Sequence, residues 1–162
     1  MRLKDKVIIV TGGTSGIGQA MAERAVAEGA RVLVQGIERA DGEAVVAKLG
    51  SAAVLQVDDL IDPASPARIV AAAVAAFGRI DAVVNNAAIV ARSNLASTSA
   101  ANFDRMMAVN VRAPMLLIQA AFPQLKMNEG CVLNIGSINA HSGQANLLDY
   151  SLSKGAMQTL SR

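Results

Sequence analysis

The sequence predicts an α/β protein built on a doubly wound parallel sheet, with helices covering both faces in a three-layer α/β/α arrangement. Short β-branched runs alternate with amphipathic helical segments along the whole chain. The runs are apolar at successive positions, as in parallel strands that are buried on both faces. Hydrophobic residues make up 52% of the chain and aromatic residues only 2%, so small side chains can pack helices closely on a sheet. Right-handed crossovers then give the strand order 3-2-1-4-5.

The first half of the chain predicts three strands and three helices in alternation. Gly29 and Gly50 are placed to end the first two helices, and Asp62-Pro63 is typical of the start of the third. Strands are expected at 7–10, 31–35 and 53–57, and helices at 15–28, 38–49 and from 62 to about 77.

The second half continues the alternation with longer helices. A fourth strand is expected at 81–84, a long fourth helix at about 99–125, a fifth strand at 131–135 and a last helix from about 149 onward. Ligands bind at the carboxyl ends of the strands in such sheets. We therefore expect the functional residues directly after strands one, four and five.

Composition excludes several classes of function. The formal net charge is +2 and the basic residues are scattered, which argues against a nucleic-acid partner or an anionic membrane surface. No apolar run approaches the roughly 20 residues of a membrane span, and no residues have metal-ligand spacing. The charged start at 1–6 does not resemble a secretory signal. Cys131 has no disulfide partner, is expected as a small hydrophobic residue in a buried strand, and is consistent with a reducing cytoplasm.

A glycine-rich loop follows the first strand, with the sequence Thr-Gly-Gly-Thr-Ser-Gly-Ile-Gly at 11–18. Glycines permit backbone angles and close approaches that a Cβ would block. The helix behind them presents free N–H groups and a positive dipole end to a diphosphate. A tight turn that binds nothing is the alternative, but the strand–turn–helix context favours a dinucleotide site.

This loop resembles the cofactor motif of the classical short-chain dehydrogenase/reductase family, including its 3-oxoacyl reductase-like members. The family implies Asn-Asn-Ala-Gly after strand four, and this chain has Asn85-Asn86-Ala87-Ala88, with Ala in the last place. The acidic-hydrophobic pair that borders the adenine is matched by Asp59-Leu60, with Asp58 as an alternative acid. The resemblance implies that NAD or NADP is held by Gly12, Thr14, Ser15, Gly16, Ile17, Gly18, Asp59, Leu60, Asn86, Ala87, Ala88, Tyr150 and Lys154.

A Tyr-x-x-x-Lys pair, Tyr150 and Lys154, lies near the C-terminal end of the sequence. Spacing of i, i+4 places both side chains on one helix face. A phenol has an ordinary pKa of about 10, and a neighbouring ammonium lowers the pKa of such a group. The pair therefore predicts a general acid–base at neutral pH.

Two further residues match the family's catalytic pattern. Ser137 stands thirteen residues before Tyr150, and Asn110 lies in the predicted fourth helix. The resemblance implies that Tyr150 exchanges a proton with the substrate oxygen, Ser137 holds that oxygen, and Lys154 also binds the nicotinamide ribose. It implies that the backbone carbonyl of Asn110 anchors a water. Pro114 lies four residues later and has no N–H, which predicts that this carbonyl lacks a helical partner.

The resemblance as a whole implies an NAD(P)-dependent oxidoreductase that acts on a small-molecule carbonyl or secondary alcohol and works as a cytoplasmic homo-oligomer. We expect residues 1–162 to form one Rossmann-type NAD(P)-binding domain that is incomplete at its C-terminus. A non-catalytic nucleotide-binding or interaction module is the alternative.

The choice between NAD and NADP stays open. Gly36 stands where a carboxylate would favour NAD, and Arg39 is close enough in sequence to reach a 2′-phosphate. Ser15, however, stands where many NADP-preferring relatives carry a basic residue. Gly36 and Arg39 therefore favour NADP, whereas Ser15 argues against it.

Overall fold

The computed structural model describes residues 1–162 and contains one five-stranded parallel sheet. The strand order is β3-β2-β1-β4-β5, which confirms the predicted topology. In register, Val10 of β1 lies beside Val34 of β2 and Val84 of β4. The strands are β1 (Val7–Val10), β2 (Arg31–Gly36), β3 (Ala53–Val57), β4 (Ala82–Asn85) and β5 (Cys131–Asn134).

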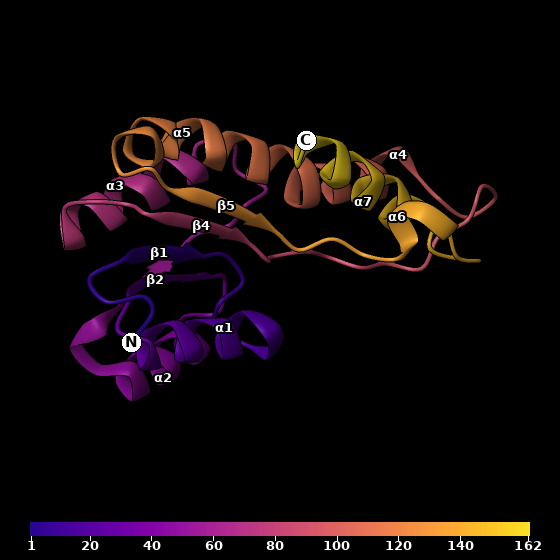
Figure 1. Ribbon diagram of the computed structural model, residues 1–162. Helices are drawn as coiled ribbons and strands as arrows, with labels where there is room; N and C mark the ends of the chain where they lie inside the picture. The colour runs from indigo at the N-terminus through magenta and orange to yellow at the C-terminus, as the bar shows by residue number, and fades with distance from the viewer.

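Helices cover the sheet on both sides, as the apolar strands predicted (Figure 1). Helices α1 (Gly16–Ala27) and α2 (Arg39–Leu49) lie on one side. Helices α3 (Ser65–Phe77), α5 (Ala113–Met127) and α7 (Leu148–Leu160) lie on the other. Successive side chains of β1 enter opposite layers, since Ile9 belongs to one buried cluster and Ile8 and Val10 to the other.

The long helix predicted at 99–125 is divided into three parts. Helix α4 (Ala100–Met107) is followed by a π-helical segment, η2 (Ala108–Arg112), and then by α5. The backbone N–H of Ala113 bonds to the carbonyl of Ala108, five residues back. Pro114 follows directly and has no N–H, so the regular i→i−4 ladder cannot continue through it. Whether a water occupies the Asn110 carbonyl stays a prediction.

Smaller differences occur in turns. The third helix begins at Ser65 rather than at 62, because the Asp62 side chain accepts a hydrogen bond from the Ala64 N–H and holds a turn there. A short 3₁₀ segment, η1 (Gly50–Ala52), joins α2 to β3, and a single helical turn, α6 (Asn139–Ser142), precedes α7. No helix combines the length and apolar character needed to cross a membrane.

The expectation that Cys131 lies in a buried strand is wrong. Cys131 is exposed, and Val132 and Leu133 keep 36% and 49% of their surface accessible. Strand β5 pairs with β4 along one edge and has no strand along the other. An edge strand leaves its backbone groups and side chains open to solvent, which accounts for the exposure of these apolar residues.

Candidate functional site

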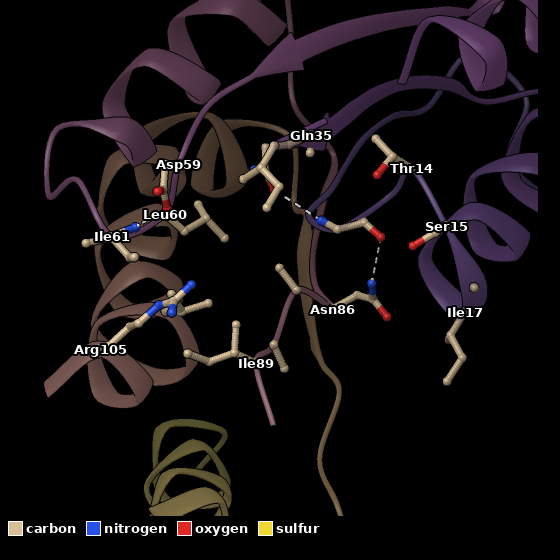
Figure 2. Close-up of a pocket in the computed structure, with 17 residues that line it drawn as sticks. Thr14, Ser15, Ile17, Gln35, Asp59, Leu60, Ile61, Asn86, Ile89 and Arg105 are labelled. Atoms are coloured by element: carbon tan, nitrogen blue, oxygen red, sulfur yellow. Dashed lines mark hydrogen bonds between the residues drawn. The ribbon is translucent and has the colours of Figure 1, made fainter. Parts of the chain in front are cut away.

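A cavity of about 440 Å³ opens at the carboxyl ends of the first four strands (Figure 2). The glycine loop, the loop after β3 and the loop after β4 form its walls, and α4 with η2 adds Arg105 and Val109. Ten of the eleven loop residues expected to hold the cofactor line it: Gly12, Thr14, Ser15, Gly16, Ile17, Asp59, Leu60, Asn86, Ala87 and Ala88.

Gly18, the eleventh, lies behind the cavity in the first turn of α1. A Cβ built on Gly18 would lie 2.2 Å from the Gly12 carbonyl oxygen and 2.4 Å from Asn86 Nδ2. Only glycine lets the helix approach the loop this closely. Gly12 has a φ of 60°, a left-handed conformation that also favours glycine. Gly18 is therefore required for steric reasons, and Gly12 for its backbone conformation.

Thr11 and Asn86 join the glycine loop to the loop after β4. The Asn86 side-chain amide donates to the carbonyls of Thr11 and Gly12, at 2.9 and 3.1 Å. The Thr11 hydroxyl accepts hydrogen bonds from the backbone N–H groups of Asn86 and Ala87, both at 3.1 Å. These bonds fix two walls of the cavity relative to each other.

Gln35 is a site residue that the sequence reasoning missed. It is 1% exposed, its Oε1 accepts from the Gly12 N–H at 3.1 Å, and its Nε2 donates to the Asp58 carbonyl at 2.7 Å. It thus connects the glycine loop to the end of β3. A polar residue within the buried part of strand β2 was the available signal. The other lining residues that were not expected are Ile37, Ile61, Ile89, Arg105 and Val109.

The structure separates the two adjacent aspartates after β3. Asp59 lines the cavity, whereas Asp58 is buried and bonds to Arg68, with 2.9 Å between Asp58 Oδ2 and Arg68 Nε. The Arg68 hydrogen bonds hold the pKa of Asp58 below its ordinary value. Asp58 therefore serves an internal ion pair, and Asp59 is the acid available to a ligand.

The end of β2 has no room for an acidic side chain. A Cβ built on Gly36 would lie 2.3 Å from Cγ2 of Thr14, so Thr14 fills that place. Arg39 does not line the cavity, and its guanidinium lies 3.6 Å from Glu43. The charged residues that line the cavity are Asp59 and Arg105.

Helix α7 brings Tyr150 and Lys154 together, as their spacing predicted. Lys154 Nζ lies 5.7 Å from the centroid of the Tyr150 ring. The lysine is 3% exposed and donates a 2.6 Å hydrogen bond to the Ile135 carbonyl at the end of β5. Burial lowers the pKa of the Lys154 ammonium, because removal from water disfavours its charged form.

Ser137 and Lys154 line a second cavity of about 210 Å³, between the end of β5, α6 and α7. His141 lines it too. The Ser137 hydroxyl accepts a 3.2 Å hydrogen bond from the Asn139 N–H. No hydrogen bond joins Ser137 to Tyr150, and Tyr150 lines neither cavity. Lys154 therefore lies near the Tyr150 ring and lines the same cavity as Ser137, but Ser137 and Tyr150 are not in contact through a hydrogen bond.

Asn110, the remaining predicted catalytic residue, is completely buried in η2. Its Oδ1 accepts from the Ile89 N–H at 2.9 Å, and its Nδ2 donates to the Ile89 carbonyl at 3.0 Å. The same Nδ2 donates to the Ser153 hydroxyl at 3.0 Å. Asn110 therefore connects the wall of the larger cavity to the helix that carries Tyr150 and Lys154.

Comparisons with known proteins agree with this geometry. A family model described as short chain dehydrogenase matches residues 6–162. An uncharacterized oxidoreductase of Thermotoga maritima is 36% identical over 100% of this chain and 65% of its own length. The 2,5-dichloro-2,5-cyclohexadiene-1,4-diol dehydrogenase LinX of Sphingobium indicum is 35% identical, over 99% of this chain and 66% of its own. The chain thus spans about two-thirds of the length of these relatives.

Solved structures are similar over almost the whole chain. The 3-ketoacyl-(acyl-carrier-protein) reductase from Brucella melitensis, complexed with NADH, has a TM-score of 0.93 and 33% identity, covering 98% of this chain and 68% of its own. A metagenomic short-chain oxidoreductase in complex with NADP has a TM-score of 0.92 and 31% identity, covering 99% and 75% respectively.

Proposed function

Because the chain belongs to the short-chain dehydrogenase family, we propose that it is an NAD(P)-dependent oxidoreductase acting on the carbonyl or secondary alcohol of a small molecule. We infer that residues 1–162 act as its single Rossmann-type cofactor-binding domain. The observation that carries the proposal is the larger cavity, which is lined by ten of the residues expected to hold the cofactor. Structural neighbours complexed with NADH and NADP support it.

Three features of the glycine loop support binding of a dinucleotide. A Cβ on Gly12 would lie 2.9 Å from the Ala87 Cα, so the glycine permits the close approach of the two loops that line the cavity. The Ser15 side chain makes no capping hydrogen bond at the start of α1, which leaves first-turn N–H groups for an anion. No acidic residue stands in that turn to repel a diphosphate. These features support binding of the diphosphate at the glycine loop.

The remaining cofactor contacts follow from the cavity walls. We assign Asp59 and Leu60 to the adenine and Asn86, Ala87 and Ala88 to the wall between the diphosphate and the nicotinamide. When bound, the nicotinamide ring supplies or accepts the hydride.

Four residues of the chain would perform the acid–base chemistry. Tyr150 donates a proton to the substrate oxygen during reduction and removes it during oxidation. The Lys154 ammonium, 5.7 Å from the Tyr150 ring centroid, binds the nicotinamide ribose. Ser137 donates a hydrogen bond to the same oxygen as charge develops on it. Asn110 holds the cavity wall and, through its carbonyl, a water that links Lys154 to solvent.

A non-catalytic nucleotide-binding module is the second candidate. The dehydrogenase relatives do not favour it. It would account for one observation, namely that Tyr150 lines neither cavity and has no hydrogen bond to Ser137. In that case the chain would bind NADH or NADPH without turnover.

Replacing the tyrosine separates the two candidates. In the complete protein, Tyr150→Phe should lower turnover of NADH or NADPH with a panel of carbonyls by about 10²- to 10⁴-fold, because the proton donor is lost. Cofactor affinity measured by calorimetry should stay within about two-fold, since the ring is retained. Ser151→Ala, on the same helix, is the control and should leave both quantities unchanged. Cofactor binding without turnover by the unaltered protein would favour the module.

A further inference from the structure

We propose that Ser153 is a positioning residue, whose buried hydroxyl fixes the helix of Tyr150 and Lys154 against the wall of the cofactor cavity. This inference rests on the proposed function. Ser153 is completely buried, although it is a hydroxyl residue at the centre of a helix. Burial of an unpaired hydroxyl costs free energy, so its partners indicate what it does.

Both hydrogen-bonding capacities of the Ser153 hydroxyl are used. It accepts a 3.0 Å hydrogen bond from Nδ2 of Asn110 and donates a 2.7 Å hydrogen bond to the backbone carbonyl of Tyr150. A hydroxyl can donate and accept simultaneously, which Ala, Val and carboxylates cannot do. Serine is therefore a suitable residue between the Asn110 amide, which donates, and the Tyr150 carbonyl, which accepts.

Asn110, which donates to the Ser153 hydroxyl, also binds the wall of the larger cavity. Asn110 binds both backbone groups of Ile89, and Ile89 lines the larger cavity. A continuous chain of hydrogen bonds thus runs from the wall through Asn110 and Ser153 to the backbone of Tyr150. Buried hydrogen bonds of this kind hold geometry more strongly than exposed ones, because water does not compete for them.

Tyr150 and Lys154 keep their mutual spacing because they lie on one helix, but that spacing does not set their distance from the cofactor. The other polar contacts near the start of α7 lead elsewhere. Leu148 N–H bonds to the Ser93 carbonyl at 3.0 Å, and Thr98 donates to Asp149 at 2.7 Å. Neither Ser93 nor Thr98 lines the larger cavity. Among the hydrogen bonds of α7, those of the Ser153 hydroxyl are the ones that lead to the wall of the larger cavity.

The test compares three variants of the complete protein. Ser153→Ala removes the hydroxyl, and Ser153→Thr retains it as the rescue variant. Ser151→Ala is the matched control, because the Ser151 hydroxyl lies on the same helix and has no hydrogen-bond partner. Residues 1–162 contain one tyrosine, Tyr150, and no tryptophan. The emission of Tyr150 in the complete protein is obtained as the difference between each protein and its counterpart that also carries Tyr150→Phe. Its quenching by acrylamide measures the placement of α7 without any cofactor.

We expect Ser153→Ala to lower kcat by about 10- to 100-fold, the effect of a small displacement of a catalytic group. The dissociation constant for NADH or NADPH, whichever the unaltered protein binds, should stay within about two-fold, and acrylamide should quench Tyr150 more strongly. Ser153→Thr should restore both kcat and quenching. Equal kcat in Ser153→Ala and Ser151→Ala, or a loss of thermal stability with unchanged kcat, overturns the positioning role. Absence of binding of both NADH and NADPH by the unaltered protein overturns the proposed function, and this inference with it.

Discussion

Gly18→Ala should destabilise the protein, although alanine is the better helix former. A Cβ at this position of α1 would lie 2.2 Å from the Gly12 carbonyl oxygen and 2.4 Å from Asn86 Nδ2. Both distances are below the 3.0 Å that real Cβ contacts respect. The helix or the glycine loop must therefore shift, and the Asn86 hydrogen bonds to Thr11 and Gly12 are strained or lost.

The magnitude follows from three contributions. Overpacking costs about 1–3 kcal/mol, and each weakened hydrogen bond of Asn86 costs about 1 kcal/mol. The gain from replacing glycine with alanine in a helix is about 1 kcal/mol. The net expected loss is about 3 kcal/mol, which for a chain of this size lowers Tm by about 6–12 °C.

The matched control is Gly155→Ala, in α7. Its nearest atom outside the helix backbone is the Ala140 carbonyl oxygen at 3.9 Å, an ordinary contact. This variant should gain about 0.5–1 kcal/mol from helix propensity alone. Urea unfolding followed by circular dichroism measures both free energies. If Gly18→Ala were as stable as Gly155→Ala, the close approach between α1 and the glycine loop would not have the energetic importance that we assign to it.

Two further predictions concern charge and cofactor choice. Burial lowers the pKa of Lys154 in the folded chain below its ordinary value of 10.5. Between these two pKa values the unfolded chain binds more protons than the folded chain. The free energy of unfolding should therefore rise with pH across that interval. Lys154→Met should abolish this rise in the free energy of unfolding, measured by urea unfolding at a series of pH values. If the rise persisted in the variant, another titrating group would be its cause. Gly36→Asp alone should fail to improve NADH affinity over NADPH affinity, because Thr14 occupies the space of its Cβ. Gly36→Asp combined with Thr14→Ala should favour NADH by about 10-fold in calorimetry, and equal behaviour of the single and double variants would contradict the steric reasoning.

The sequence predicted the main features of the fold because these depend on local patterns. The β-branched runs and the helical periodicity identified every strand of the sheet, and the crossover rule then fixed the strand order. Helix ends were less accurate, as at Ser65, since a turn stabilised by Asp62 and a helix start present similar residues. The glycine loop was recognisable because strand, turn and helix are contiguous there.

The candidate site was predicted in part. Motif positions identified ten lining residues of the larger cavity and the Tyr150–Lys154 pair, because each motif lies directly after a strand or on one helix. Gln35 was missed, since its importance depends on contacts with Gly12 and Asp58, which are far from it in sequence. The choice between Asp58 and Asp59 likewise depended on the position of Arg68.

The sequence by itself therefore determined the class of sheet, the order of its strands and the residue types available for cofactor and proton chemistry. The tertiary structure decided which of these residues face the cavity, which are used in internal bonds, and how α7 is held. Gln35 is used in hydrogen bonds to Gly12 and Asp58, and Ser153 is buried because α7 packs on η2. The physical reason is common to both residues: burial and hydrogen-bond partners are set by segments distant in sequence, which periodicity and motif spacing do not describe.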